Sequence, residues 1–319
     1  MKPLEHITAL ALSLCLSAAA FAQSGTNSGT NAGANANVDA ALVAYRRGDA
    51  IAALNLLHPL ADGGDTEAQF TLAMVLEFGL GKEEEAAGWY RRAAGTGHAA
   101  AANSLGAMYF DGRGVPEDRA RARELYLAAA QRDYAPAQYN LAQLYGQGAA
   151  GQRDDAQMIV WLERAAKSGY ARAQAQLGRL HMDGTGVPQD FAAAARWFRA
   201  AADQDDPRAQ FYLSVLMQKG AGVARDPDRA RAWLEKAAGQ GNDLASFELA
   251  RAYELGLGLP PDAGKALRYY RRSADAGYTL AMERLLRVYR NGELGVAPDA
   301  ILEQLMTVRL RLARSHGKN

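Results

Sequence analysis

The sequence predicts an all-α fold: a right-handed α-solenoid of about seven 36-residue helix-turn-helix repeats with capping helices at both ends. The main observation is that two series of residues recur with the same period. Alanines followed four residues later by leucine recur from Ala101 to Ala281, and a mostly aromatic series recurs from Trp89 to Leu305. Every step in both series is 36 residues. Two independent columns with one period indicate stacked copies of a single supersecondary unit.

Each unit begins with the apolar pattern of a helix that buries one face. In one unit, Ala137, Leu141, Leu144 and Tyr145 follow the spacing i, i+4, i+7 and i+8, which is the stripe of an amphipathic helix. We name this segment helix A. Ala68 begins one more unit, but it lies 33 residues before Ala101. The first unit therefore lacks three residues in its loop near 79–82.

A glycine-rich loop separates helix A from the second helix of each unit, helix B. Its fullest copies are 111–118 and 183–190, which both read Asp-Gly-x-Gly-Val-Pro-x-Asp. The glycines permit positive φ where helix A ends, and Val-Pro favours an extended step. Asp118, Asp190 and Asp226 then stand where helix B needs an N-cap acceptor,. Helix B carries the aromatic column, so we expect Trp197→Ala to unfold or fray the array.

The N-terminus predicts export. Lys2 precedes an apolar run over 7–21, and Ala20-Phe21-Ala22 fits a signal-peptidase site, so 1–22 is the predicted signal peptide with cleavage after Ala22,. A retained anchor is disfavoured because about 15 apolar residues fall short of the roughly 20 that span a bilayer. A lipoprotein signal at Cys15 is disfavoured by the preceding Leu14. We therefore expect a periplasmic or secreted protein.

The rest of the chain divides by composition and period. Residues 23–37 are rich in Gly, Ser, Thr, Asn and Ala and predict a flexible linker,. Residues 38–63 predict an N-terminal capping hairpin, 64–298 the repeats, and 299–319 a C-terminal capping helix and tail. The last helix is apolar at Ile301, Leu302, Leu305, Met306 and Leu310, as a cap over the final apolar face should be.

Charge and cysteine content exclude several classes of partner. The 36 Lys and Arg nearly balance the 35 Asp and Glu, for a net charge of +1, which gives no broad field for nucleic acid or anionic lipid as main partners. Cys15 is the only cysteine. The mature chain therefore holds neither a disulfide nor a thiolate metal site.

The repeat resembles a known family. Its consensus, Ala-x-x-x-Leu-Gly-x-x-Tyr-x-x-Gly-x-Gly-Val and then Asp and Ala-Ala-x-x-Gly, is similar to the Sel-1-like repeat, a relative of the tetratricopeptide repeat. The best copies are 98–134, 136–170 and 171–206, and the resemblance covers 64–298. Departures at 149–152 and 259–261 affect only loops. The resemblance implies an adaptor in protein complexes, including those of the cell envelope.

No pattern of catalytic or metal-binding residues appears. The histidines of the mature chain are His58, His98, His181 and His316, none in a metal-ligand spacing, and no Gly-x-Ser-x-Gly occurs,. We predict no enzyme, no metal and no cofactor. One alternative is a hydrolase of peptidoglycan or a β-lactam, an activity that the resemblance connects with members carrying a cysteine pair in each repeat, absent here. Another is a structural protein that assembles through its ends or its C-terminal helix.

The candidate binding residues lie on helix A, opposite its buried stripe. At 100° per residue, the positions of helix A that point away from helix B should line a concave groove. They include Phe70, Tyr139, Gln143, Arg179, Phe211, Phe247, Arg251, Arg287 and Arg290. These rings either anchor a ligand or wedge between adjacent helices A, and the arginines either take a carboxylate or are plain surface charge.

We therefore expect a non-enzymatic scaffold of the bacterial envelope. Its partner is expected to be a peptide, a protein or an envelope polysaccharide held in the concave groove. We expect no nucleic-acid partner, and no stable membrane span once the signal peptide has been removed.

Overall fold

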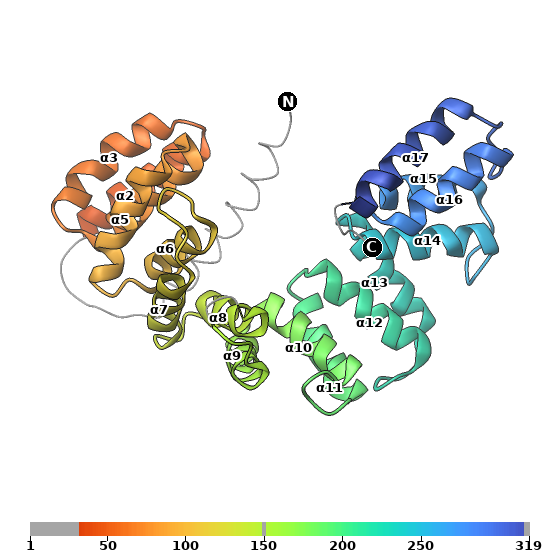
Figure 1. Ribbon diagram of the computed structural model, residues 1–319, viewed down its shortest axis with the longest axis horizontal. Helices are drawn as coiled ribbons and strands as arrows, with labels where there is room; N and C mark the ends of the chain where they lie inside the picture. Colours follow the sequence, from red (N-terminus) through yellow and green to blue (C-terminus); the bar gives the residue numbers. More distant parts are fainter. Residues whose placement is uncertain (1–31, 149–150, 316–319) are drawn as a thin grey trace. The chain divides into compact units, whose positions relative to one another are not determined.

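The computed structural model describes residues 32–148 and 151–315, which form helices joined by short loops, with no strand in these ranges (Figure 1). The predicted signal peptide and most of the predicted linker fall outside the described residues. Helix α2 begins at Ala32, so residues 32–37, expected as linker, are helical. Three alanines in this short stretch favour a helix, which its overall composition obscured.

The chain divides into two compact units, residues 1–168 and 169–319. In the first unit the elements are α2 (Ala32–Arg46), α3 (Ala50–Asp62), α4 (Thr66–Met74), the π-helix η2 (Val75–Gly79), α5 (Glu83–Gly95), α6 (Ala99–Asp111), α7 (Arg119–Ala130), α8 (Ala135–Gln147) and α9 (Asp155–Lys167). In the second unit they are α10 (Ala171–Asp183), α11 (Phe191–Ala202), α12 (Pro207–Lys219), α13 (Pro227–Gly239), α14 (Asp243–Leu255), α15 (Ala263–Asp275), α16 (Thr279–Asn291) and α17 (Ala300–Ser315).

Helices A and B alternate along both units as the repeat predicts. From α6 onward, every even-numbered helix up to α16 ends at a glycine in the left-handed conformation, as Gly112 does at φ 67°,. The predicted N-caps of helix B are confirmed at Asp118, Asp190 and Asp226, whose side chains accept backbone N–H groups of the first turn. Glycine therefore ends helix A and aspartate begins helix B.

The first repeat is three residues shorter than the others, and the end of its helix A differs from that of the other repeats. Helix α4 continues without a break into the π-helix η2, instead of ending at a left-handed glycine. Glu77 lies in this wider turn and is buried, with 8% of its surface exposed. A π-helix is an uncommon element that often accompanies a specialised site, and Glu77 is one member of the polar contacts described below.

Successive repeats are joined by a recurring glutamine. Gln138, at the start of α8, is 1% exposed and donates its side-chain amide to the carbonyl oxygen of Ala130, the last residue of α7, at 3.2 Å. Gln69 and Gln210 make the corresponding bonds to Ala61 and Ala202. Each bond adds a second donor to a carbonyl at the end of helix B, which already accepts a backbone N–H of the following turn,.

Within a repeat, a glycine of helix A makes room for a ring of helix B. A Cβ at Gly178 would lie 2.9 Å from ring atoms of Phe198, and one at Gly106 would lie 2.9 Å from the ring of Tyr126. These distances are shorter than real carbon contacts allow. Glycine in the Leu-Gly pair of the repeat therefore sets how closely helices A and B approach.

The buried column of helix B lies one residue after the predicted one. Phe198, Tyr90 and Tyr270 are each at most 1% exposed, whereas Trp197 is only partly buried. Neighbouring residues on a helix point in directions 100° apart, so the predicted column and the buried column lie side by side. The tryptophans made the predicted column the more conspicuous one in the sequence. Phe198 is therefore the more deeply buried of the two, and the expected effect of Trp197→Ala stays a prediction.

Candidate functional site

Three of the predicted groove residues lie in the first unit and are half-buried. Phe70 on α4 stacks on His98, with ring centroids 4.7 Å apart, and its ring also approaches Tyr90. His98 is the N-cap of the next helix A, α6. Tyr139 and Gln143 lie on α8 and are partly accessible. Phe70 thus connects one helix A to the start of the next.

The phenylalanines of the second unit also pack. Phe211 on α12 is 9% exposed. Phe247 on α14 meets Tyr278, the N-cap of α16, with ring centroids 5.1 Å apart, and Tyr270 of α15 at 5.6 Å. Phe247 therefore repeats in this unit the contact that Phe70 makes in the other. The rings of Phe70 and Phe247 therefore pack between adjacent helices A, which is one of the two roles expected for the groove aromatics.

The arginines of the predicted groove remain exposed. The side chains of Arg179, Arg251 and Arg290 are 61%, 44% and 56% exposed, and each forms a surface ion pair. Those partners are Asp183, Glu248 and Glu303. Arg287 is exposed as well. Exposed ion pairs contribute about 0–1 kcal/mol, so these guanidinium groups can exchange their partners for a ligand.

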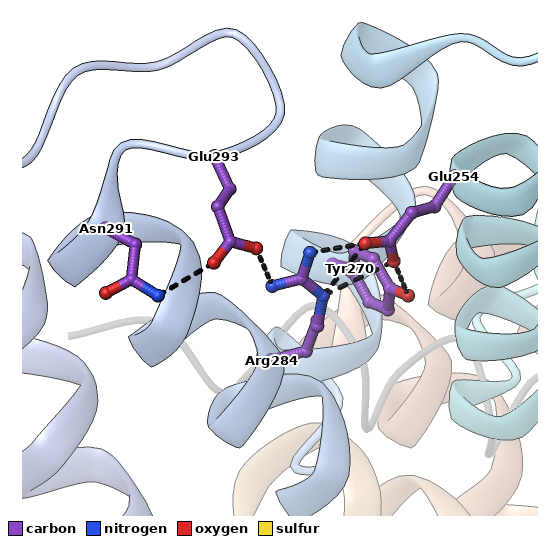
Figure 2. A network of polar contacts seen from close by, with 5 residues as sticks. All are labelled: Glu254, Tyr270, Arg284, Asn291 and Glu293. Atoms are coloured by element: carbon purple, nitrogen blue, oxygen red, sulfur yellow. Dashed lines mark hydrogen bonds and ion pairs between the residues drawn. The ribbon is translucent and has the colours of Figure 1, made fainter.

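The most connected polar contacts of the second unit were not predicted. Glu254 at the end of α14 accepts a hydrogen bond of 2.6 Å from the Tyr270 hydroxyl and pairs with Arg284 of α16. Arg284 Nη1 lies 2.6 Å from Glu293, which also accepts from Asn291 at 2.8 Å. Figure 2 shows Arg284 between the two carboxylates. We call these five residues the Glu254 network.

The charges of the Glu254 network are fixed by their neighbours. Burial raises the pKa of Glu254, but hydrogen bonds from Arg284 and Tyr270 outweigh it and hold that pKa below its ordinary value. The hydrogen bond to Glu254 is also the largest cause of the raised pKa of Arg284. Burial, followed by the hydrogen bond to Glu254, raises the pKa of Tyr270. The carboxylate is therefore ionised and the phenol neutral near pH 7.

The first unit contains a similar carboxylate, which is buried and pairs with an arginine at a different position of the repeat. Glu77 and Tyr90 occupy the repeat positions of Glu254 and Tyr270, and their hydrogen bond is 2.9 Å. Arg113 supplies the cation at 2.5 Å, from the loop that follows α6. The position of Arg113 in the repeat is held by Glu293 in the second unit. Each carboxylate thus joins its own repeat to the next one.

These contacts are structural, because every charge in the Glu254 network has a partner. A sequence signal for these contacts exists. Glutamate in helix A and tyrosine in helix B occur together at the same repeat positions in two repeats, as Glu77 with Tyr90 and as Glu254 with Tyr270. Among the described residues, no group of three or more His, Cys, Asp or Glu is arranged to hold a metal ion. No helix in the same ranges is long and apolar enough to cross a membrane.

Comparison with known proteins identifies the repeat. The family model described as "Sel1 repeat" matches six consecutive segments, 66–98, 99–134, 135–170, 171–206, 207–242 and 243–278. The first is three residues shorter than the others, as the spacing predicts. The matches end before α16 and α17, which form the last helix pair. A comparison with curated proteins gives no match.

Two solved structures share the fold. A Sel1 repeat protein from Oxalobacter formigenes is 32% identical, with a TM-score of 0.70 over 75% of this chain and 97% of that one. The protective antigen c5321 of uropathogenic Escherichia coli, which displays an SLR fold, is 27% identical, with a TM-score of 0.68 over 99% of this chain and 65% of its own length. The predicted all-α solenoid is confirmed, and the chain belongs to the Sel1 repeat family.

Proposed function

We propose that the chain is a non-enzymatic protein-binding scaffold of the bacterial cell envelope, and that it binds an acidic peptide segment on the helix A surface of its second unit. The observation that carries this proposal is the difference between the two kinds of predicted groove residue. Phe211 and Phe247 are used in packing, whereas Arg251 and Arg287 stay exposed. The accessible chemistry of this surface is therefore cationic.

Arg251 and Arg287 occupy the same position in successive repeats, on α14 and α16. In an extended peptide, side chains two residues apart point to the same face, about 7 Å from one another. Arg284 is held by Glu254 and Glu293 and is not available for a ligand. The surface therefore suits an extended peptide with two carboxylates two residues apart, each bound by one guanidinium group.

The envelope part of the proposal rests on the signal-peptide pattern of residues 1–22. Binding in place of catalysis is supported by the Glu254 network, in which the ionisable groups are all paired. A neutral envelope polysaccharide would use the exposed arginines as hydrogen-bond donors but not their charge.

A peptide titration tests the proposal. The fluorescein-labelled peptide Gly-Glu-Ala-Glu-Gly is titrated with the protein at low salt, and its anisotropy is compared with that of the peptide carrying Gln for Glu. We expect the Glu peptide to bind and Arg251→Gln/Arg287→Gln to weaken binding about tenfold, as loss of charged hydrogen bonds should. Arg172→Gln/Arg208→Gln, at exposed positions elsewhere in the unit, is the control. Equal binding of both peptides would contradict the proposal.

A further inference from the structure

The C-terminal helix α17 has a second apolar face that stays exposed among the described residues. Met306 and Leu310 point into the core and are 4% and 9% exposed. On another side of the helix, four aliphatic side chains follow one another at spacings of four, three and four residues. They are Ile301 at 81% exposed, Leu305 at 48%, Val308 at 47% and Leu312 at 55%. We call these four residues the outer stripe.

Three of the four stripe positions are not apolar by requirement of the repeat; the fourth, Leu305, belongs to the helix B column that holds Tyr269 on α15 and Trp233 on α13. On α15, one repeat earlier, the positions of Ile301, Val308 and Leu312 are held by Lys265, Arg272 and Ala276. On α13 the same positions are held by Arg229, Lys236 and Gln240. Apart from the column of Leu305, this side of helix B therefore carries no large aliphatic side chain in these two earlier repeats. Four exposed aliphatic side chains along one helix indicate a surface that is covered in use.

The surroundings of the outer stripe are basic. Residues 263–315 contain ten Lys and Arg but five Asp and Glu. Four of these acidic groups pair with arginines and Asp299 caps α17. Arg309 bonds to Asp275 and to the carbonyl oxygen of Ala274, which fixes α17 beside the end of α15. Arg268 on α15 and Arg311 on α17 are exposed and form no ion pair among the described contacts. The net charge of +1 for the whole chain conceals this local excess.

The charges select among the possible occupants of the stripe. A second copy docked through the same face would place arginine against arginine, which disfavours pairing. A partner helix in a coiled coil is disfavoured because the stripe covers about three turns, whereas coiled coils sustain the spacing over at least 3–4 heptads. An aliphatic stripe with cationic flanks on two helices is the pattern of a surface that lies on anionic lipid.

We propose that α17, with the outer face of α15, docks on an anionic lipid surface. The outer stripe enters the boundary between head groups and acyl chains, and Arg268 and Arg311 contact lipid phosphates. This is a peripheral contact, since α17 covers its inner face with the core of its own unit. It uses helix B and leaves the peptide surface on helix A free, so the two proposals stand or fall separately.

Vesicle sedimentation tests this proposal. The protein, as a chain beginning at Gln23, keeps every residue that the structure describes and lacks the apolar run at 7–21, which would bind lipid by itself. It is mixed with vesicles of phosphatidylcholine, with or without phosphatidylglycerol. We expect binding only to the anionic vesicles, and binding should weaken as salt is raised.

Two pairs of variants make the test specific. Leu305→Ser/Val308→Ser should weaken binding to anionic vesicles about tenfold, whereas Leu257→Ser/Leu280→Ser, at sites 57% and 47% exposed, should not,. Arg268→Gln/Arg311→Gln should weaken it about thirtyfold, at about 1 kcal/mol for each basic residue, against Arg172→Gln/Arg208→Gln as the control. Unchanged melting temperatures exclude misfolding as the cause.

Three results would overturn the proposal. They are equal binding to neutral and anionic vesicles, no binding to either, and binding that the stripe substitutions leave unchanged. A native mass of two chains that Leu305→Ser/Val308→Ser reduces to one would assign the stripe to self-association instead. Any of these outcomes leaves the peptide titration unaffected, because that experiment uses neither α17 nor lipid.

Discussion

The Tyr270 hydroxyl donates a hydrogen bond of 2.6 Å to a carboxylate oxygen of Glu254. Tyr90 and Glu77 form the same bond five repeats earlier. In both places the carboxylate is also bound by an arginine that follows it in the next repeat, Arg284 or Arg113. A hydrogen-bonded carboxylate with a cation from the neighbouring repeat thus joins the two helices of one repeat to the next repeat in both places, and its loss should affect stability.

Arg284→Gln should lower the free energy of unfolding by about 2 kcal/mol. The substitution leaves Glu254 partly buried without its cation, and an uncompensated buried charge is strongly destabilising. Urea unfolding measures the change. Arg287→Gln, one turn away and exposed, is the matched control and should stay within about 0.5 kcal/mol of the parent. If both variants unfold together with the parent, the Glu254 network does not stabilise the unit.

The stability of the parent should fall in acid, in part through Glu254. Its pKa is held below the ordinary 4.5, so ionised Glu254 stabilises the fold above pH 4.5 and this contribution disappears as the pH falls through the lower, folded-state pKa. In Arg284→Gln, burial still raises the pKa of Glu254, but the hydrogen bond from Arg284 that lowers this pKa is lost. The difference in unfolding free energy between parent and variant should therefore shrink between pH 6 and pH 3. A difference that is constant over this range would show that Arg284 does not act through the charge of Glu254.

Gly178→Ala should destabilise the protein although alanine is the better helix former. The new methyl group would lie 2.9 Å from the Phe198 ring, and overpacking of this kind costs about 1–3 kcal/mol. Gly88 on α5 provides the control, since a Cβ there meets nothing within 4 Å. Gly88→Ala should stabilise by about 0.5–1 kcal/mol. Thermal melting distinguishes the two, and a stabilised Gly178→Ala would mean that the ring does not limit the approach of helix A to helix B.

Phe198→Ala should be more damaging than Trp197→Ala. Phe198 is fully buried, and removing a buried phenylalanine costs about 3–5 kcal/mol. Trp197 keeps part of its surface in solvent, so its loss should cost roughly half as much. Comparison of the two midpoints of urea unfolding checks the order. The reverse order would restore the tryptophan column as the main packing column of helix B.

The period made most of the fold predictable. The alanine and leucine columns place the start of each helix A, and the Gly and Asp positions place the ends of the helices, because both rest on local backbone chemistry. The start of α2 at Ala32 was missed because a composition rich in Gly, Ser and Asn obscured three alanines. The π-helix η2 was missed because a deletion says only that residues are absent, not how the backbone accommodates their loss.

The candidate site was less predictable, because helical angles locate a face and not its neighbours. The helix A stripe was identified, yet the contacts of Phe70 and Phe247 depend on which aromatic residue begins the next helix A. The Glu254 network joins residues as far as 39 positions apart and does not recur in every repeat. The outer stripe of α17 was missed in part because Leu305 was interpreted as the inner face of a cap.

The most direct test of the scaffold proposal is photo-crosslinking in cells. A photoreactive residue replaces the exposed Gln218 at the end of α12, on the helix A surface, or Asp228 on α13 as the helix B control. Mass spectrometry then identifies the captured segment. We predict capture of an acidic segment from position 218 only, and its loss in the Arg251→Gln/Arg287→Gln background. Equal capture from both positions, or capture that does not depend on these arginines, would contradict a peptide-binding surface on helix A.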